Sequence, residues 1–326
     1  MANTDLVLEG GGIKGIALVG AVFKLMEKGY EFPRLAGTSA GSIVASFLAA
    51  GASKEQLVAV MDNLDYSRVP DRAWPGIPVL SEGESLMLKA GAYRGHYVHA
   101  FLEEELAKLG VKTFKDLIAP DDPQADPRFR KFHRYKLMVT ATDVTNGRLL
   151  RLPWDYELLG LDPDQQSVAT AVRASMSIPL YFEPVKIKAK GGKEVVLVDG
   201  GVLSNFPIQA FDRTDGKEPR WPTFGVKIIP NLPADMKDLF PTVPGGALPP
   251  LDMLERVAAT AIVGHDQTYL ERPCVQRRTI EVDTSEIGIV EFDAPPEKRE
   301  TVRTKGEAAA DSFLAGWDWA SYKRSC

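Results

Sequence analysis

A serine held between two glycines is the first feature of the sequence that could do chemistry. Gly37-Thr-Ser-Ala-Gly41 has the spacing G-x-S-x-G and stands between a short apolar run and a helix-forming stretch. In a strand–turn–helix context this spacing puts the serine in a sharp turn. Its hydroxyl then points outward at a helix N-terminus, where negative charge is favoured. We therefore predict that Ser39 is a nucleophile; the alternative is a glycine-softened helix cap without catalysis.

A serine nucleophile needs a base, and the sequence offers two candidates. Asp199 follows the apolar run Val195–Val198 and precedes two glycines, which predicts a carboxylate at a sheet edge beside open backbone. It could take the serine proton directly and return it to a leaving alcohol, and partial burial would raise its low pKa. His265 would complete a Ser-Asp-His order, but Ser39 comes too early for an α/β-hydrolase, and His265 falls on the apolar side of its predicted helix. We favour Asp199; its alternative interpretation is a turn-forming Asp-Gly pair.

A glycine-rich loop precedes both. Gly10-Gly-Gly-Ile-Lys-Gly15 follows a predicted strand, opens a predicted helix and matches the dinucleotide-binding fingerprint, with Glu31 near the offset of a ribose-binding acid. Backbone N–H groups at a helix N-terminus can bind a pyrophosphate, but they can equally bind the oxyanion of an acyl-transfer intermediate. From this loop alone, three interpretations remain open: the oxyanion site of a hydrolase, the phosphate site of a nucleotide-binding protein, or a tight turn that binds no ligand.

The sequence resembles the patatin-like phospholipase family, and it is most similar to the bacterial members. The resemblance rests on three motifs in this order: the glycine loop, the serine turn and Asp199-Gly-Gly201. Gly91–Gly95, Ala141–Asp143 and Ala174–Pro179 are also similar, and the resemblance covers about residues 5–230. It implies a three-layer α/β/α sandwich with a central, mainly parallel sheet. The implied reaction is hydrolysis of phospholipid or lysophospholipid esters, with no metal and no cofactor.

The resemblance also assigns roles to single residues. It implies that Ser39 and Asp199 form a catalytic dyad and that the backbone N–H groups of Gly11 and Gly12 form the oxyanion hole. Lys14 stands where the family has arginine or lysine, which implies a substrate-binding role, although lysine offers a point charge and no bidentate fork.

The elements that must position these residues follow from the hydrophobic pattern. The first 65 residues predict strand–loop–helix–strand–turn–helix, typical of α/β folds. The predicted strands are 5–9, 32–36, 135–144, 147–152, 195–198 and 223–229, and the predicted helices are 14–28, 41–50, 54–64, 97–109, 166–175, 251–269 and 300–319. We expect one domain over residues 1–326, with a motif core of about 5–230 and C-terminal helices in 251–320 packed on it. The irregular segments 65–92 and 230–250 are candidates for a lid.

Composition limits the partners. The chain has 39 lysine and arginine residues against 44 aspartate and glutamate residues, a net charge of −5, which argues against nucleic-acid binding. A phospholipid substrate would require transient contact with a membrane surface. The pattern gives no indication of the oligomeric state.

The remaining signals concern the compartment. The uncharged run 35–53 holds too many small and polar residues for a membrane span, and the N-terminus has no signal-peptide pattern. We expect a cytoplasmic protein, with export by a signal-less route left open. Cys274 and Cys326 lie 52 positions apart, and we expect both to be free thiols in a reducing compartment.

Overall fold

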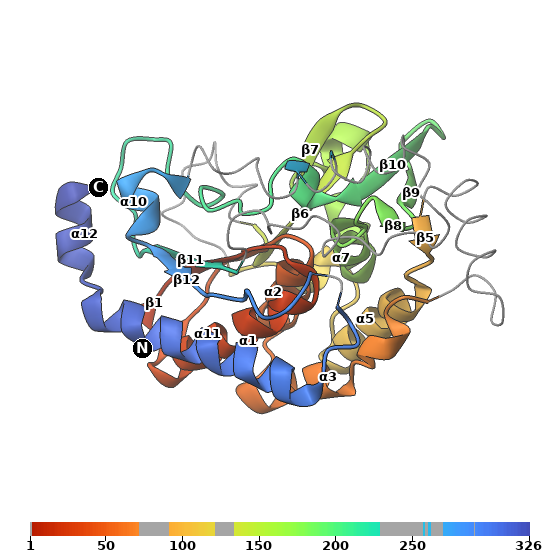
Figure 1. The fold of residues 1–326 in the computed structure, drawn as a ribbon. Helices are drawn as coiled ribbons and strands as arrows, with labels where there is room; N and C mark the ends of the chain where they lie inside the picture. The colour runs from red at the N-terminus through yellow and green to blue at the C-terminus, as the bar shows by residue number, and fades with distance from the viewer. Residues whose placement is uncertain are drawn as a thin grey trace.

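The computed structural model describes residues 2–71, 91–120, 134–228, 257, 260, 261, 270–289 and 291–326. Within these residues, a central eight-stranded sheet organises the chain (Figure 1). Its strands lie in the order β12 (Thr279–Glu281), β11 (Thr223–Lys227), β2 (Asp5–Leu8), β4 (Leu35–Gly37), β6 (Leu137–Asp143), β10 (Glu194–Asp199) and β9 (Val185–Lys188), and β7 (Arg148–Leu152) also pairs with β6.

The sheet is parallel from β12 to β6 and antiparallel where β10, β9 and β7 join it. Strands β2, β4 and β6 are buried along their whole length, as expected for central strands covered on both faces. Two short pairs complete the described strands, β1 (Ala2–Asn3) with β3 (Tyr30–Glu31) and β5 (Gly91–Tyr93) with β8 (Leu180–Phe182). The predicted α/β/α class with a mainly parallel sheet is confirmed.

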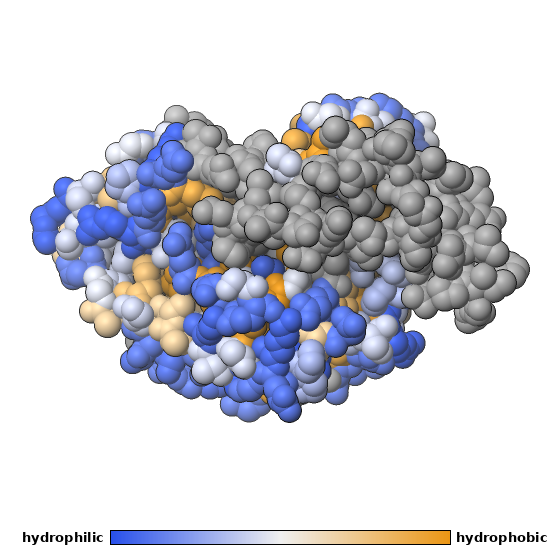
Figure 2. Space-filling view, in the orientation of Figure 1, coloured by the Kyte–Doolittle hydropathy of each residue, from blue (hydrophilic) through white to orange (hydrophobic). Residues whose placement is uncertain are grey.

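Helices cover the sheet and one another. Contacts with the sheet come from α1 (Gly15–Glu27), α2 (Ala40–Ala49) and α7 (Val168–Ser175), while α5 (His96–Lys108) packs on α7 and α3 (Lys54–Asn63) on α2. The long helix α11 (Pro296–Gly316) lies along α1, and Figure 2 shows mostly hydrophilic residues on its outer side. The two helices touch at glycines, because a Cβ at Gly20 or Gly306 would collide with a backbone carbonyl of the other helix.

The strand register brings distant parts of the chain to one level of the sheet. Gly37, at the end of β4, pairs with Val139 of β6, so the chain reaches Ser39 two residues further along. On the other side of β6, Asp199 at the end of β10 pairs with Ala141. Neighbouring strands are about 4.8 Å apart, so a turn after β4 and the end of β10 lie within side-chain reach across β6.

The C-terminal region differs from the prediction in two respects. The helix expected over 300–319 is present as α11, but its expected C-terminal bound is wrong, because α11 ends at Gly316. A second helix, α12 (Trp319–Ser325), begins after Asp318, whose carboxylate accepts a hydrogen bond from the Ser321 N–H (2.7 Å). This aspartate is an ordinary N-cap, and it favours a new start over continuation.

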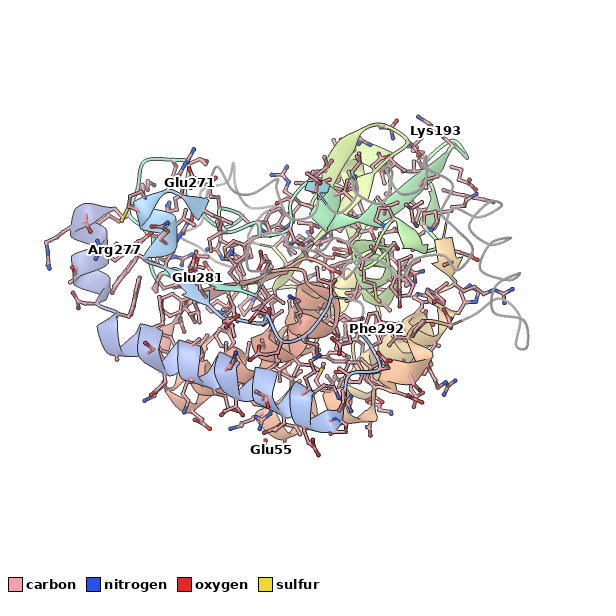
Figure 3. All side chains as sticks on the ribbon, in the orientation of Figure 1. Glu55, Lys193, Glu271, Arg277, Glu281 and Phe292 are labelled. Atoms are coloured by element: carbon pink, nitrogen blue, oxygen red, sulfur yellow. A yellow bond between two sulfur atoms is a disulfide. The ribbon has the colours of Figure 1, made fainter. Side chains whose placement is uncertain are left out.

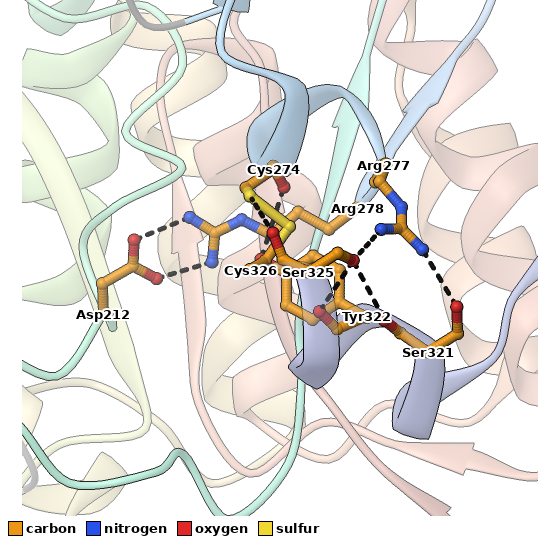
Figure 4. The surroundings of a disulfide bond; sticks show 8 residues. All are labelled: Asp212, Cys274, Arg277, Arg278, Ser321, Tyr322, Ser325 and Cys326. Carbon is orange, nitrogen blue, oxygen red and sulfur yellow. Dashed lines mark hydrogen bonds and ion pairs between the residues drawn. A yellow bond between two sulfur atoms is a disulfide. The ribbon is translucent and has the colours of Figure 1, made fainter.

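The free thiols are also wrong, because Cys274 and Cys326 form a disulfide with their Cα atoms 5.5 Å apart (Figure 4). Cys274 lies on the short helix α10 (Pro273–Gln276), and α12 folds back against it. Arg277 strengthens this contact by donating to the Ser321 and Ser325 hydroxyls. Sequence separation alone did not reveal this proximity, which depends on the path of α11 across the molecule.

Three expectations lie wholly or largely outside the described residues: most of the helix 251–269, most of the candidate lid 65–92, and the candidate lid 230–250. The single domain over 1–326 stays a prediction. In the part of the chain that the structure describes, no helix is both long and apolar enough to cross a membrane.

Candidate active site

Ser39 occupies a strained turn between β4 and α2. Its φ of 50° and ψ of −124° are unusual for a residue with a side chain, and such backbone strain is concentrated at functional sites. The turn is tight enough to demand its glycines, since a Cβ at Gly41 would collide with the carbonyls of Leu8 and Glu9. The Ser42 hydroxyl donates to the Ser39 carbonyl (2.6 Å) and ties the turn to the first turn of α2. The sequence pattern therefore predicted the local structure correctly.

Ser39 and Asp199 approach each other across β6, and the Ser39 hydroxyl is close enough to the Asp199 carboxylate to lower its pKa. Asp199 is only 1% exposed and Ser39 only 5%. Burial raises the pKa of Asp199 to about 7, against the opposing effects of the Gly201 N–H, which donates to it at 2.7 Å, and the Ser39 hydroxyl. A carboxylate with this pKa is a far better base near neutral pH than a solvated aspartate.

One segment that the sequence analysis noted only as a similarity fixes the backbones of both residues. The Ser175 hydroxyl, at the end of α7, accepts the Ser39 N–H (2.9 Å). Two residues on, the Ser177 carbonyl accepts the Asp199 N–H (2.8 Å). Both serines lie in Ala174–Pro179, and the similarity of that run to the family was the signal in the sequence that could have pointed to them. Their role is to position the two reacting groups.

Arg173 holds this segment in place. Its buried guanidinium donates to the carbonyls of Arg94, Gly95 and Glu183 and to the Ser177 hydroxyl. It therefore joins the start of α5, the end of α7 and the loop after β8, and burial lowers its pKa to about 10.

The glycine loop lies directly against the nucleophile. A Cβ built on Gly10 would come within 3.1 Å of the Ser39 Cβ, and the Gly10 backbone is paired in both directions with Asn205. Among the described residues, no hydrogen-bond acceptor is found for the N–H groups of Gly11 and Gly12. Gly12 has a φ of +57° and lines the same pocket as Ser39. The Ser39 N–H, in contrast, is bound to the Ser175 hydroxyl.

An apolar pocket opens from Ser39. Helix α2 contributes Ala40, Ile43 and Val44, and the remaining apolar lining comes from segments far apart in the chain: Ile13, Ile16, Met61, Leu64, Val69, Val98, Met176, Ile178, Phe182 and Phe292. Phe292, labelled in Figure 3, belongs to the segment before α11. Apart from Ser39, the Tyr66 hydroxyl is the polar side-chain group among the described lining residues. This lining suits a hydrocarbon chain.

The nucleotide interpretation of the glycine loop gains nothing from this geometry. Glu31 lies on β3, ahead of β4, whereas a ribose-binding acid should follow its strand at the edge where the glycine loop lies. A nucleotide would also place phosphates and a ribose in a pocket whose described lining residues include no charged side chain.

Lys14 and His99 are not among the described residues that line the pocket at Ser39. The Lys14 side chain is buried and lies outside the described pocket lining. Burial lowers its pKa, against the opposing carboxylates of Glu9, Asp283 and Glu286. Substrate binding by Lys14 therefore stays a prediction. His99 on α5 is hydrogen-bonded to Thr170 (3.2 Å), and His133 and His265 lie outside the described residues.

Comparison with known proteins places this site in a family context. A family model described as patatin-like phospholipase matches residues 6–212. The uncharacterised protein YqhO of Bacillus subtilis is 39% identical over 227 residues, which are 69% of this chain and 71% of that protein. A probable lipid hydrolase of Invertebrate iridescent virus 6 is 26% identical over 209 residues, 62% of this chain and 61% of that protein.

Other relatives are longer. An uncharacterised NTE family protein of Mycobacterium tuberculosis is 26% identical over 324 residues, 94% of this chain and 46% of that protein. This chain therefore spans about half the length of the mycobacterial relative. The crystal structure of VipD from Legionella pneumophila superimposes with a TM-score of 0.53 and 18% identity, over 96% of this chain and 66% of that chain.

Proposed function

The chain belongs to the patatin-like phospholipase family, and we propose that it hydrolyses acyl esters of phospholipids or lysophospholipids through Ser39 and Asp199. Family membership places the protein among lipid ester hydrolases. The observation that carries the finer proposal is the approach of a strained serine, which lines an apolar pocket, to a buried aspartate with a raised pKa.

In the first step, the Ser39 oxygen attacks the ester carbonyl while the Asp199 carboxylate takes its proton. The raised pKa of Asp199, about 7, brings the base close to the pH at which it must work. The turn holds the hydroxyl at the N-terminus of α2, so the attacking oxygen needs little reorganisation.

The negative oxygen that develops in this step falls beside the glycine loop. We assign its stabilisation to the Gly11 and Gly12 N–H groups, which have no competing acceptor among the described residues. A single donor of this kind contributes about 2.7–4 kcal/mol to transition-state stabilisation.

Collapse of the intermediate breaks the ester bond. The Asp199 carboxylic acid returns the proton to the leaving alcohol, which departs, and the acyl group stays on Ser39. A water molecule then attacks the acyl-serine while Asp199 takes a proton from it, and a second collapse releases the fatty acid and restores the serine. The apolar pocket holds the acyl chain throughout.

Release of fatty acid from a panel of phospholipids and lysophospholipids tests the proposal. We expect the unmodified protein to release fatty acid and a fluorophosphonate to label Ser39, whereas Ser39→Ala and Asp199→Asn should lack turnover and retain the fold. If Asp199→Asn keeps substantial activity while His265→Ala loses it, a histidine triad operates. Binding of NAD(P) without labelling would refute the hydrolase.

The same proposal requires the protein to meet a lipid surface transiently. Co-sedimentation with phosphatidylcholine vesicles should be weak for the resting protein and stronger for a Ser39→Ala variant, which binds substrate without turning it over. Equal sedimentation of the two would contradict this part of the proposal.

A further inference from the structure

The apolar pocket at Ser39 adjoins a second hollow on the protein surface. This hollow, the outer groove, lies between α1, α3 and the N-terminal part of α11, which Figure 1 shows side by side. Ile16, Met61 and Tyr66 line both hollows. The inner pocket and the outer groove therefore adjoin at these shared side chains.

Of the three shared residues, Met61 is the one best able to move. Ile16 is buried and β-branched, so its rotamers are few. The Tyr66 ring is buried and lies under the Arg299 guanidinium, 4.8 Å from the ring centre. Met61 is half-buried, unbranched and has three rotatable side-chain bonds.

Beyond Met61 the groove has an apolar floor and a charged rim. The floor includes Val19, Phe23 and Val58, and Val58 is 37% exposed among the described residues. Lys54 and Arg303 lie over the Phe23 ring, 5.2 Å and 5.9 Å from its centre. A groove that is apolar below and charged at its edges fits a hydrocarbon chain lying lengthwise better than a polar ligand.

We propose that the distal part of a long acyl chain passes Met61 and lies in the outer groove, so that Met61 and Val58 determine the range of acyl chain lengths the protein accepts. The proposal rests on the acyl-ester hydrolase function above and on the continuity of the groove with the pocket at Ser39. Short chains end inside the pocket and never meet Val58, whereas long chains contact both residues.

Three variants on α3 test this. Val58→Glu places a charge on the groove floor, Met61→Trp fills the passage, and Ala59→Glu introduces the same charge as the first variant at an exposed neighbour that does not line the groove. The measured quantity is the ratio of kcat/KM for p-nitrophenyl hexadecanoate to that for the butanoate. Because each methylene that loses apolar burial weakens binding about fourfold, Val58→Glu and Met61→Trp should lower this ratio at least about tenfold. Ala59→Glu should leave it within about twofold.

A second measurement separates failure of this inference from failure of the hydrolase proposal. Butanoic, octanoic, dodecanoic and hexadecanoic acids are titrated calorimetrically into the Ser39→Ala protein, alone and combined with Val58→Glu or with Ala59→Glu. Selective loss of hexadecanoate affinity in the double variant with Val58→Glu supports the groove even if no ester is turned over. Equal behaviour of Val58→Glu and Ala59→Glu in both measurements overturns the proposal and leaves the role of Ser39 untouched.

Discussion

Replacing Asp199 with asparagine should abolish activity and at the same time stabilise the protein at alkaline pH. Asparagine keeps the size of the side chain and an oxygen that can accept the Gly201 N–H, but it removes the charge. In the folded protein, burial raises the pKa of Asp199 to about 7, compared with 3.8 for a solvated aspartate. At 1.36 kcal/mol per pH unit, this difference in pKa means that ionised Asp199 lowers the free energy of unfolding by at most about 4 kcal/mol.

The direction of this pH effect on stability depends on whether Asp199 keeps its proton in the folded or in the unfolded chain. Below about pH 4 the carboxyl is protonated in both the folded and the unfolded chain, so it costs the fold nothing. Between about pH 4 and pH 7 the unfolded chain ionises first, and the free energy of unfolding of the unmodified protein falls as the pH rises. Above about pH 7 Asp199 is ionised in both states, and the full destabilisation by its buried charge is present. The asparagine variant ionises in neither state and should not show this fall.

The assay is urea denaturation of both proteins at about pH 5 and pH 8, monitored by tryptophan fluorescence. We expect the stability difference, variant minus unmodified protein, to be larger at the higher pH by up to about 3 kcal/mol, since part of the cost is already present at the lower one. In parallel, kcat/KM of the unmodified protein should rise with pH around a midpoint near 7. A stability difference that is constant across this range would refute the inference that burial raises the pKa of Asp199.

Three further outcomes test other parts of the structure. Ser39→Gly should be more stable than Ser39→Ala by about 1 kcal/mol, because glycine relieves the positive φ while both lack the hydroxyl, and equal urea midpoints would contradict the strain. Arg173→Met should lower the free energy of unfolding by about 3 kcal/mol, since it leaves buried carbonyls unpaired; an unchanged urea midpoint would show that they find other donors. The Cys274–Cys326 disulfide joins residues 52 positions apart, and its loss should lower the free energy of unfolding by about 2–4 kcal/mol. Dithiothreitol should therefore lower the Tm of the unmodified protein but leave that of Cys274→Ser unchanged.

Much of the fold could be predicted from local pattern. The strand before the glycine loop, the helix after it and the strand–turn–helix around Ser39 lie within a few residues of their expected bounds, because buried apolar runs and glycine turns act over short distances. The short strands β5, β8, β9 and β12 were not predicted, since their existence depends on partners elsewhere in the chain.

For the site, the sequence by itself determined the residue types and their local geometry. The spacing G-x-S-x-G between a strand and a helix is typical of a sharp, strained turn, and Ser39 has the positive φ of 50° that such a turn contains. The tertiary structure decided everything that depends on distance through space. Asp199 lies 160 positions after Ser39, and it reaches the serine only because β10 runs antiparallel beside β6 while β4 runs parallel on its other side.

Burial at that meeting point raises the pKa of Asp199, and the Ser175–Ser177 segment holds both backbones in place. The C-terminal disulfide also depends on tertiary structure, since α12 folds back against α10 and brings Cys326 to Cys274. Sequence pattern encodes what a residue and its near neighbours can do, whereas the proximity and the dielectric surroundings of a group are set by chain segments that the local pattern does not contain.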